Sequence, residues 1–212
     1  MRPTQILSSE HRVIEVVLDS LEQMVIRSRG TYTLDRALAE QFVDFIRTFA
    51  DGCHHGKEEN HLFTALEEKG ASRENGPVGV MLHEHTLGRN FVGQMSANIK
   101  AAALGDKVAL QIFLINAEGY IQLLRAHILK EDQILFPLAD SLFTDEDQIR
   151  IGASFDHVES HHMGEGTHQK YLDLAKSLAD EFGVKADALH GLVSCGCSHS
   201  KKQQSVNQTQ AV

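Results

Sequence analysis

The chain contains 212 residues, with a formal net charge of -9, three prolines, three cysteines and no tryptophan. The acidic balance argues against nucleic acid as a partner, and no run of about 18 apolar residues would cross a membrane. No apolar leader follows Met1, and an odd number of cysteines does not form an even disulfide framework, so we expect a protein of the reducing cytoplasm.

Apolar residues recur at the spacing of an α-helix along most of the chain, and the alternation typical of strands is rare. We therefore predict an all-α fold built on four long helices. Short connections between them predict an antiparallel up-down-up-down bundle. The expected helices run from Thr4 or Ser8 to Arg27, from Leu34 to Lys69, from Pro77 to the turn at Gly105-Asp106, and from Lys107 to Leu142.

Glycine and proline mark the expected boundaries. The segment from Gly30 to Thr33 should form the first turn, and Gly70 should cap the second helix. Pro77 suits the first turn of the third helix, whereas Pro137 is placed to kink the fourth.

After the bundle, Thr144 and the three acidic residues that follow it are typical of a helix start. A fifth helix is expected over about 145–181, broken near Gly152 or near 164–166. From Gly183 the composition becomes polar. We therefore expect a helical domain over residues 1–182, with its fifth helix from about 145, and a flexible polar tail over 183–212.

A ten-residue pattern occurs twice, at 54–63 (HHGKEENHLF) and at 127–136 (HILKEDQILF). The two copies share a His, a Lys and a Glu, followed by an acidic residue, an amide, a Leu and a Phe. In each copy the His precedes the Glu by four residues, and residues i and i+4 lie on one face of a helix. His54 and Glu58 therefore point the same way, as do His127 and Glu131.

Two further histidines extend this repeat. A Glu-His pair at 10–11 lies 43 residues before His54, and another at 84–85 lies 42 residues before His127. In an up-down bundle these histidines come from four different helices, and bundles commonly build metal sites on their inward faces. The doubled pattern predicts a cage of four imidazoles and two carboxylates: His11, His54, His85, His127, Glu58 and Glu131.

The residue types limit the metal. Six protein ligands exceed the four of a tetrahedral zinc site, and imidazoles argue against calcium and magnesium, which prefer oxygen. The mixed set suits iron, manganese, zinc or nickel. Two metals that share both carboxylates would each take two imidazoles and keep open positions for oxo, hydroxo, peroxide or dioxygen ligands. No cysteine recurs with the repeat, which argues against an iron–sulfur cluster.

Over residues 4–142 the paired His-x3-Glu segments and the lone histidines resemble the hemerythrin-like, or HHE cation-binding, family. The resemblance implies a four-helix bundle around a non-haem diiron centre with oxo- or hydroxo-bridged iron ions. It also implies the iron ligands, with both glutamates as bridges: His11, His54, Glu58, His85, His127 and Glu131.

The pattern departs from the oxygen-carrying hemerythrins, which have a His-x3-His pair on their third helix. Met81 and Arg89 stand four residues from His85, so that fifth histidine is missing. The carriers also use His-x4-Asp at the last site, a spacing that Asp132 satisfies here, although the internal repeat favours Glu131. The pattern is similar to bacterial hemerythrin-like proteins of the H-HxxxE-H-HxxxE type, which are associated with peroxide or nitric-oxide chemistry and with iron handling.

These features favour a non-haem diiron protein that handles peroxide, dioxygen or nitric oxide. The first expectation is peroxide disproportionation, or defence against oxidative and nitrosative stress, by a catalase-like redox enzyme. The alternative is a non-catalytic sensor or binding protein for oxygen, nitric oxide or iron. A ferritin-like carboxylate site would use Glu58-x2-His61 and Glu165-x2-His168, but it leaves the His-x3-Glu repeat unexplained. The oligomeric state is left open.

Three histidines near the repeat are expected in solvent or beside the site rather than as ligands: His55, His61 and His83. Glu59 would replace Glu58 only if His55 replaced His54, and that exchange breaks the alignment with the second copy.

Tyr120 is expected in the core, or near the metals as a hydrogen-bond donor or ligand, and Cys53 is expected as a small core residue. Two polar clusters lie further along the chain. The first is expected to form a surface face, with a supplementary metal site or an entry gate as the alternative, and the second is expected to be disordered. They are His157, His161, Glu165 and His168 in the fifth helix, and Cys195, Cys197 and His199 in the tail.

Overall fold

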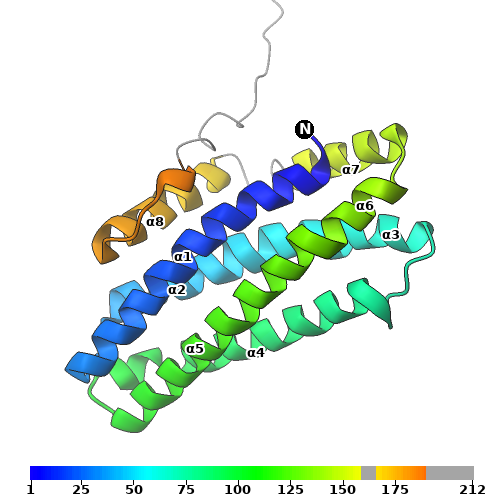
Figure 1. The fold of residues 1–212 in the computed structure, drawn as a ribbon. Coiled ribbons are helices and arrows are strands. Elements are labelled where there is room, and N and C mark those ends of the chain that lie inside the picture. The colour runs from blue at the N-terminus through cyan, green and yellow to red at the C-terminus, as the bar shows by residue number, and fades with distance from the viewer. Residues whose placement is uncertain (159–165, 190–212) are drawn as a thin grey trace, which may run out of the picture.

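The computed structural model describes residues 1–158 and 166–189, and no strand occurs among them. Four long helical rods run antiparallel to one another, so the predicted all-α bundle is confirmed (Figure 1). Two rods are single helices and two are composite. The first rod is α1 (Pro3–Thr31), and the third is α4 (Gly76–Ala103). The second rod joins α2 (Arg36–Phe45), η1 (Ile46–His55), η2 (Glu58–Leu62) and α3 (Phe63–Glu68). The fourth rod joins α5 (Lys107–Lys130), η3 (Glu131–Leu135) and α6 (Phe136–Leu142).

Side-chain caps define the starts of α2 and α5. The Asp35 carboxylate accepts a hydrogen bond from the backbone N–H of Leu38 at the start of α2 (3.0 Å), and Asp106 caps α5 in the same way. Gly70 adopts a left-handed conformation (φ 98°) just after α3, as predicted. The first turn begins later than predicted: α1 continues through Gly30, and Tyr32 takes the left-handed position (φ 57°).

An interhelical contact accounts for the extra length of α1. Arg29, in its last turn, forms an ion pair with Glu118 of α5 (2.7 Å), and the Thr31 hydroxyl donates to the carbonyl of Arg27 (3.0 Å). These contacts support a helical conformation at Gly30, whose intrinsic preference for the helix is low.

π-helical turns interrupt both composite rods at the sequence repeat, and the sequence did not predict them. η1 ends at His55, η2 begins at Glu58 and η3 begins at Glu131. Pro137 lies in the first turn of α6, and the departure from α-helical geometry falls in the turn directly before it. π-helical segments occur frequently at functional sites, and here they coincide with both halves of the predicted cage.

Two further helices, α7 (Asp145–His157) and α8 (Thr167–Phe182), and a short 3-10 turn, η5 (Asp187–Leu189), follow the bundle. The predicted fifth helix is represented by α7 and α8, and Gly166, at the second of the two expected breaks, adopts a left-handed conformation (φ 84°) at the start of α8. Thr144 caps α7 as predicted. The ring of His168 contacts the ring of Phe49 (centroids 5.5 Å apart). Several residues of the two polar clusters lie outside the described residues: His161, Glu165, Cys195, Cys197 and His199.

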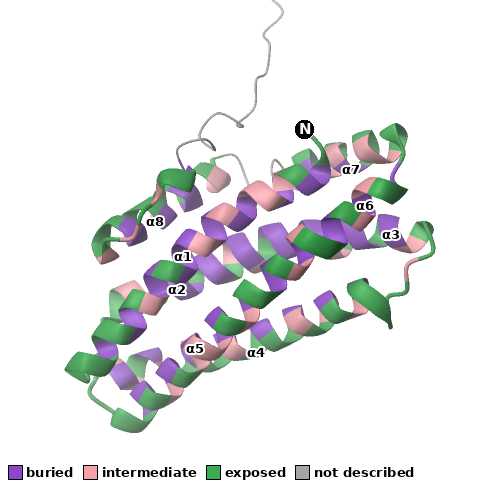
Figure 2. Cartoon of the chain, in the orientation of Figure 1, coloured by how far each residue is buried: buried purple, intermediate pink, exposed green. Residues whose placement is uncertain are grey.

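Two apolar clusters form the core, and a belt of buried polar residues separates them. The larger cluster is built mainly from α1, α2, η1, α4, α5 and α8. The smaller one joins η2, α3, η3, α6 and α7 to the N-terminal parts of α1 and α4. Figure 2 shows the buried positions along the inward sides of the rods. On α1, for example, Leu7 belongs to the smaller cluster and Val13 to the larger, with buried His11 between them. Among the described helices, none is long and apolar enough to span a membrane.

Candidate metal centre

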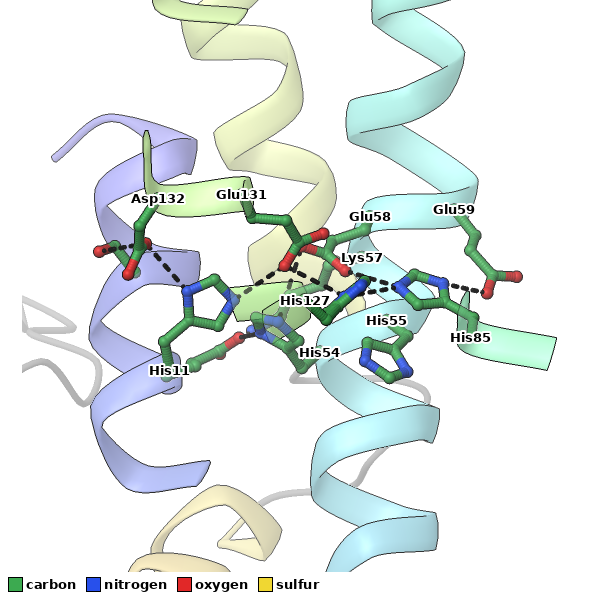
Figure 3. A network of polar contacts seen from close by, with 12 residues as sticks. His11, His54, His55, Lys57, Glu58, Glu59, His85, His127, Glu131 and Asp132 are labelled. Atoms are coloured by element: carbon green, nitrogen blue, oxygen red, sulfur yellow. Dashed lines mark hydrogen bonds and ion pairs between the residues drawn. The ribbon is translucent and has the colours of Figure 1, made fainter. Parts of the chain in front are cut away.

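The six residues of the predicted cage converge in this polar belt (Figure 3). They come from α1, η1, η2, α4, α5 and η3, and each is at most 1% exposed. The structure thus brings together side chains that are up to 120 residues apart in sequence. They are His11, His54, Glu58, His85, His127 and Glu131.

Both glutamates lie between two pairs of imidazoles. The Glu58 carboxylate oxygens stand 3.6 Å from Nε2 of His54 and 3.5 Å from Nε2 of His85. Oε2 of Glu131 stands 3.1 Å from Nε2 of His11 and 3.3 Å from Nε2 of His127. Each glutamate therefore faces one histidine from each half of the sequence repeat, which is the arrangement that a shared ligand requires.

The potential ligand atoms form two overlapping groups. In each group, one nitrogen or oxygen per residue lies within 4.8 Å of those of the other members, and Glu58 belongs to both groups. The first group is His11, His54, Glu58 and Glu131, and the second is His55, Glu58, His85 and His127.

A carboxylate accepts a hydrogen bond from Nδ1 of each predicted histidine. Within each half of the repeat, Glu10 holds His54 (2.9 Å) and Glu84 holds His127 (3.0 Å). Such a bond leaves Nε2 of each ring directed at the centre and raises the basicity of a ligand. Glu10 and Glu84 therefore orient the imidazoles of His54 and His127.

Two other carboxylates each hold a histidine from the opposite half of the sequence repeat. Glu59, next to Glu58, accepts from His85 (2.7 Å), and Asp132, next to Glu131, accepts from His11 (3.0 Å). Asp132 also accepts from the Ser8 hydroxyl (2.9 Å) and pairs with Arg12. Glu131 belongs to one of the two groups of ligand atoms, and Asp132 belongs to neither.

The lysine of each motif forms an ion pair with the glutamate that holds a histidine in the same half of the repeat. Nζ of Lys57, which is fully buried, lies 2.5 Å from Glu10, and its counterpart Lys130 pairs with Glu84. The sequence repeat contains this lysine and these acidic residues, but its spacing alone assigns them no role. Their recurrence at matched positions was the signal that could have identified them.

The sequence over residues 2–139 matches the hemerythrin HHE cation binding domain. The chain belongs to this family. Uncharacterized proteins of Mycobacterium bovis and of two strains of Mycobacterium tuberculosis are each 22% identical to it over 178 residues, which cover 84% of this chain and 69% of each relative. No solved structure matches the chain significantly. Hemerythrin-like domains bind metal cations, and the two groups of ligand atoms are the part of this domain that suits a cation.

The buried polar atoms of this hemerythrin-like domain fit a pair of cations. Both carboxylate oxygens of Glu58, Oε1 of Glu131 and Nε2 of His55 are buried without a hydrogen-bond partner in the described part of the chain. Buried polar atoms are nearly always partnered, because desolvation without a partner is costly. Four such atoms lie at this centre, and each is an oxygen or nitrogen that can donate a lone pair to a metal. This set of ligand atoms matches the preferences of iron, manganese, zinc or nickel.

The charges at the centre support the same conclusion. Burial and the neighbouring Glu131 carboxylate raise the pKa of Glu58 well above its usual range. Burial also disfavours ionisation of Glu131, but His127 and His11 outweigh it and hold the pKa of Glu131 well below its usual range. Two carboxylates that lie close together in a buried site are therefore unlike one another in charge: ionisation of one opposes ionisation of the other. Divalent cations would stabilise both carboxylates as anions.

The remaining candidates divide between core and surface. Tyr120 is 2% exposed within the larger apolar cluster, and Cys53 is 1% exposed. His83 is exposed, and the ring of half-buried His61 faces Phe155 (centroids 6.2 Å apart). The sequence predicts His55 in solvent or beside the site. It is 5% exposed and belongs to the second group, so the solvated alternative is wrong.

A cavity of about 300 Å³ borders the second group. Its lining includes His55, His85 and Tyr120, together with apolar side chains of η1, α4 and α5. A small molecule in this cavity would therefore lie beside the imidazoles of the second group.

Proposed function

We propose that the domain holds two iron ions and reacts with hydrogen peroxide. The observation that carries this proposal is the position of Glu58 and Glu131 between two pairs of imidazole Nε2 atoms. His11 and His54 would hold one ion, His85 and His127 would hold the other, and the two glutamates would be shared.

A pair of redox-active ions, when bound, supplies and accepts the two electrons exchanged in peroxide chemistry. In disproportionation, one peroxide gains two electrons and two protons and becomes two waters, and a second peroxide loses the same number and becomes dioxygen. The protein contributes the ligands, the carboxylates that orient them, and the two apolar clusters that keep bulk water out. The cavity beside His55 and His85 has room for peroxide, dioxygen or nitric oxide.

We expect the iron-loaded protein to evolve dioxygen from added hydrogen peroxide, measured with an oxygen electrode. His85→Ala and Glu131→Ala should each lower the rate at least about 100-fold, because each removes a side chain that holds the ions. His83→Ala, which changes an exposed histidine two residues from His85, should keep the rate of the unsubstituted protein.

Elemental analysis of the same samples tests the metal itself. We expect about two iron atoms per chain, together with an optical charge-transfer band that depends on iron. One tightly bound zinc ion without such a band would contradict the diiron proposal. A flat oxygen trace from protein that contains two irons, with a reversible spectral change under dioxygen, would instead indicate a sensor or binding protein.

A further inference from the structure

The second group of ligand atoms contains three imidazoles, whereas the first contains two. We propose that His55 is a metal ligand, which makes the two metal positions chemically unequal. This inference rests on the proposed function, because it assigns a further residue to the same pair of metal ions.

His55 has the environment of the other four histidines. Its Nδ1 faces a carboxylate oxygen of Asp51 (3.3 Å), just as a carboxylate holds Nδ1 of each of the others. Its Nε2 is buried and makes no hydrogen bond to any described residue. A histidine that served only for packing would leave this nitrogen desolvated without compensation, which is costly. A metal ion beside Nε2 removes that cost.

The position of the ring agrees with this role. The imidazole of His55 stacks on that of His85, with centroids 3.8 Å apart and an interplanar angle of 16°. It also meets the ring of His127 edge-on at 5.6 Å. The potential ligand atoms of these three rings and of Glu58 lie within 4.8 Å of one another, so one ion can reach all four residues.

Arg89 fixes the two carboxylates that orient His55 and His85. Its guanidinium donates to Asp51 (2.9 Å from Nε) and to Glu59 (2.7 Å from Nη2). Arg89 stands four residues after His85, so it is one of the two positions, with Met81, at which a His-x3-His pair on this helix would place a second histidine. The fifth imidazole proposed here comes from η1 instead, and Arg89 pairs with Asp51, the carboxylate that holds it.

The other half of the repeat has no equivalent of this arrangement. Ile128 occupies the place that corresponds to His55, and Leu124 the place that corresponds to Asp51. Both are core residues, 2% and 4% exposed. The fifth imidazole and its carboxylate are thus additions to one half only, so the asymmetry of the centre is encoded in the sequence.

Cobalt(II) loading followed by proton NMR tests the assignment directly. An imidazole bound to cobalt through Nε2 keeps its Nδ1 proton, which gives a strongly shifted, exchangeable resonance. We expect five such resonances from the unsubstituted protein and four from His55→Leu, with weaker binding of one of the two cobalt ions. His83→Leu should keep all five, since His83 is exposed.

A second variant covers the case in which His55→Leu does not fold. Asp51→Asn keeps His55 but weakens the acceptor at its Nδ1, so the His55 resonance should shift and one cobalt ion should bind about 10- to 100-fold more weakly. Four resonances in the unsubstituted protein, unchanged in either variant and with both cobalt ions retained, would overturn the role of His55 and leave the proposed metal pair intact. An unsubstituted protein that takes up no pair of ions would overturn both.

Discussion

His54→Ala and His127→Ala should each leave the protein with less than about a tenth of the metal content of the unsubstituted chain. Each substitution removes one imidazole from a different group of ligand atoms. Each also leaves an orienting carboxylate, Glu10 or Glu84, without its histidine. Because each glutamate lies between an imidazole of one pair and an imidazole of the other, loss of an imidazole on either side should weaken binding of both ions.

Metal content after purification from iron-supplemented cells, measured by elemental analysis, checks this prediction. His61→Ala is the matched control, because His61 lies seven residues from His54 and faces Phe155 instead of the centre. A thermal unfolding scan gives a second readout. Metal at about 100 times its dissociation constant stabilises the folded state by about 2.7 kcal/mol, so added iron should raise the Tm of the His61→Ala protein and not that of the other two. Metal loss confined to His61→Ala would favour the ferritin-like alternative.

Lys57→Met should destabilise the metal-free protein by about 3–5 kcal/mol. The side chain of Lys57 is fully buried, and its partner Glu10 is 3% exposed. Burial disfavours ionisation of Glu10, but Lys57 and His54 outweigh it and lower the pKa of Glu10 to about 2. Glu10 is therefore an anion at neutral pH, and removal of the ammonium group leaves a desolvated negative charge poorly compensated. Urea unfolding in the presence of a chelator measures the free energy of unfolding without a contribution from metal.

The repeat supplies an internal control for this substitution. Lys130 occupies the corresponding place and pairs with Glu84, but its side chain is 35% exposed. Lys130→Met should therefore cost only about 0–1 kcal/mol. The double variant Lys57→Met/Glu10→Gln should recover part of the loss, because the uncompensated charge is gone. Equal effects of Lys57→Met and Lys130→Met would show that burial of the first pair does not determine its contribution.

Local sequence properties account for much of this protein. The periodicity of apolar residues is sufficient to predict the four rods, and Asp106 and Thr144 mark helix starts through their own side chains. The spacing of four between His54 and Glu58, and between His127 and Glu131, places each pair on one helical face. The internal repeat then selected the six residues that converge, because matching positions in two halves of an antiparallel bundle meet at the same depth.

The partners of the six residues were decided by the tertiary structure. Nothing local to the sequence shows that Glu59 serves His85 or that Asp132 serves His11, since each pair joins two different rods. The same holds for His55. Its neighbour His54 aligns with the second motif and His55 does not, so the alignment predicts for His55 a position in solvent or beside the site rather than a role as ligand.

The set of helices, and one inward face on each, follow from the order of the amino acids alone. The orientation of adjacent residues at the motifs was decided only in three dimensions. A regular α-helix turns successive side chains by about 100°, whereas the π-helical turns at both motifs change that rotation. His54 therefore belongs to the first group of ligand atoms and the adjacent His55 to the second. Only the packing of α4 against η1 brings His85 into the second group and Arg89 onto Asp51 beside it.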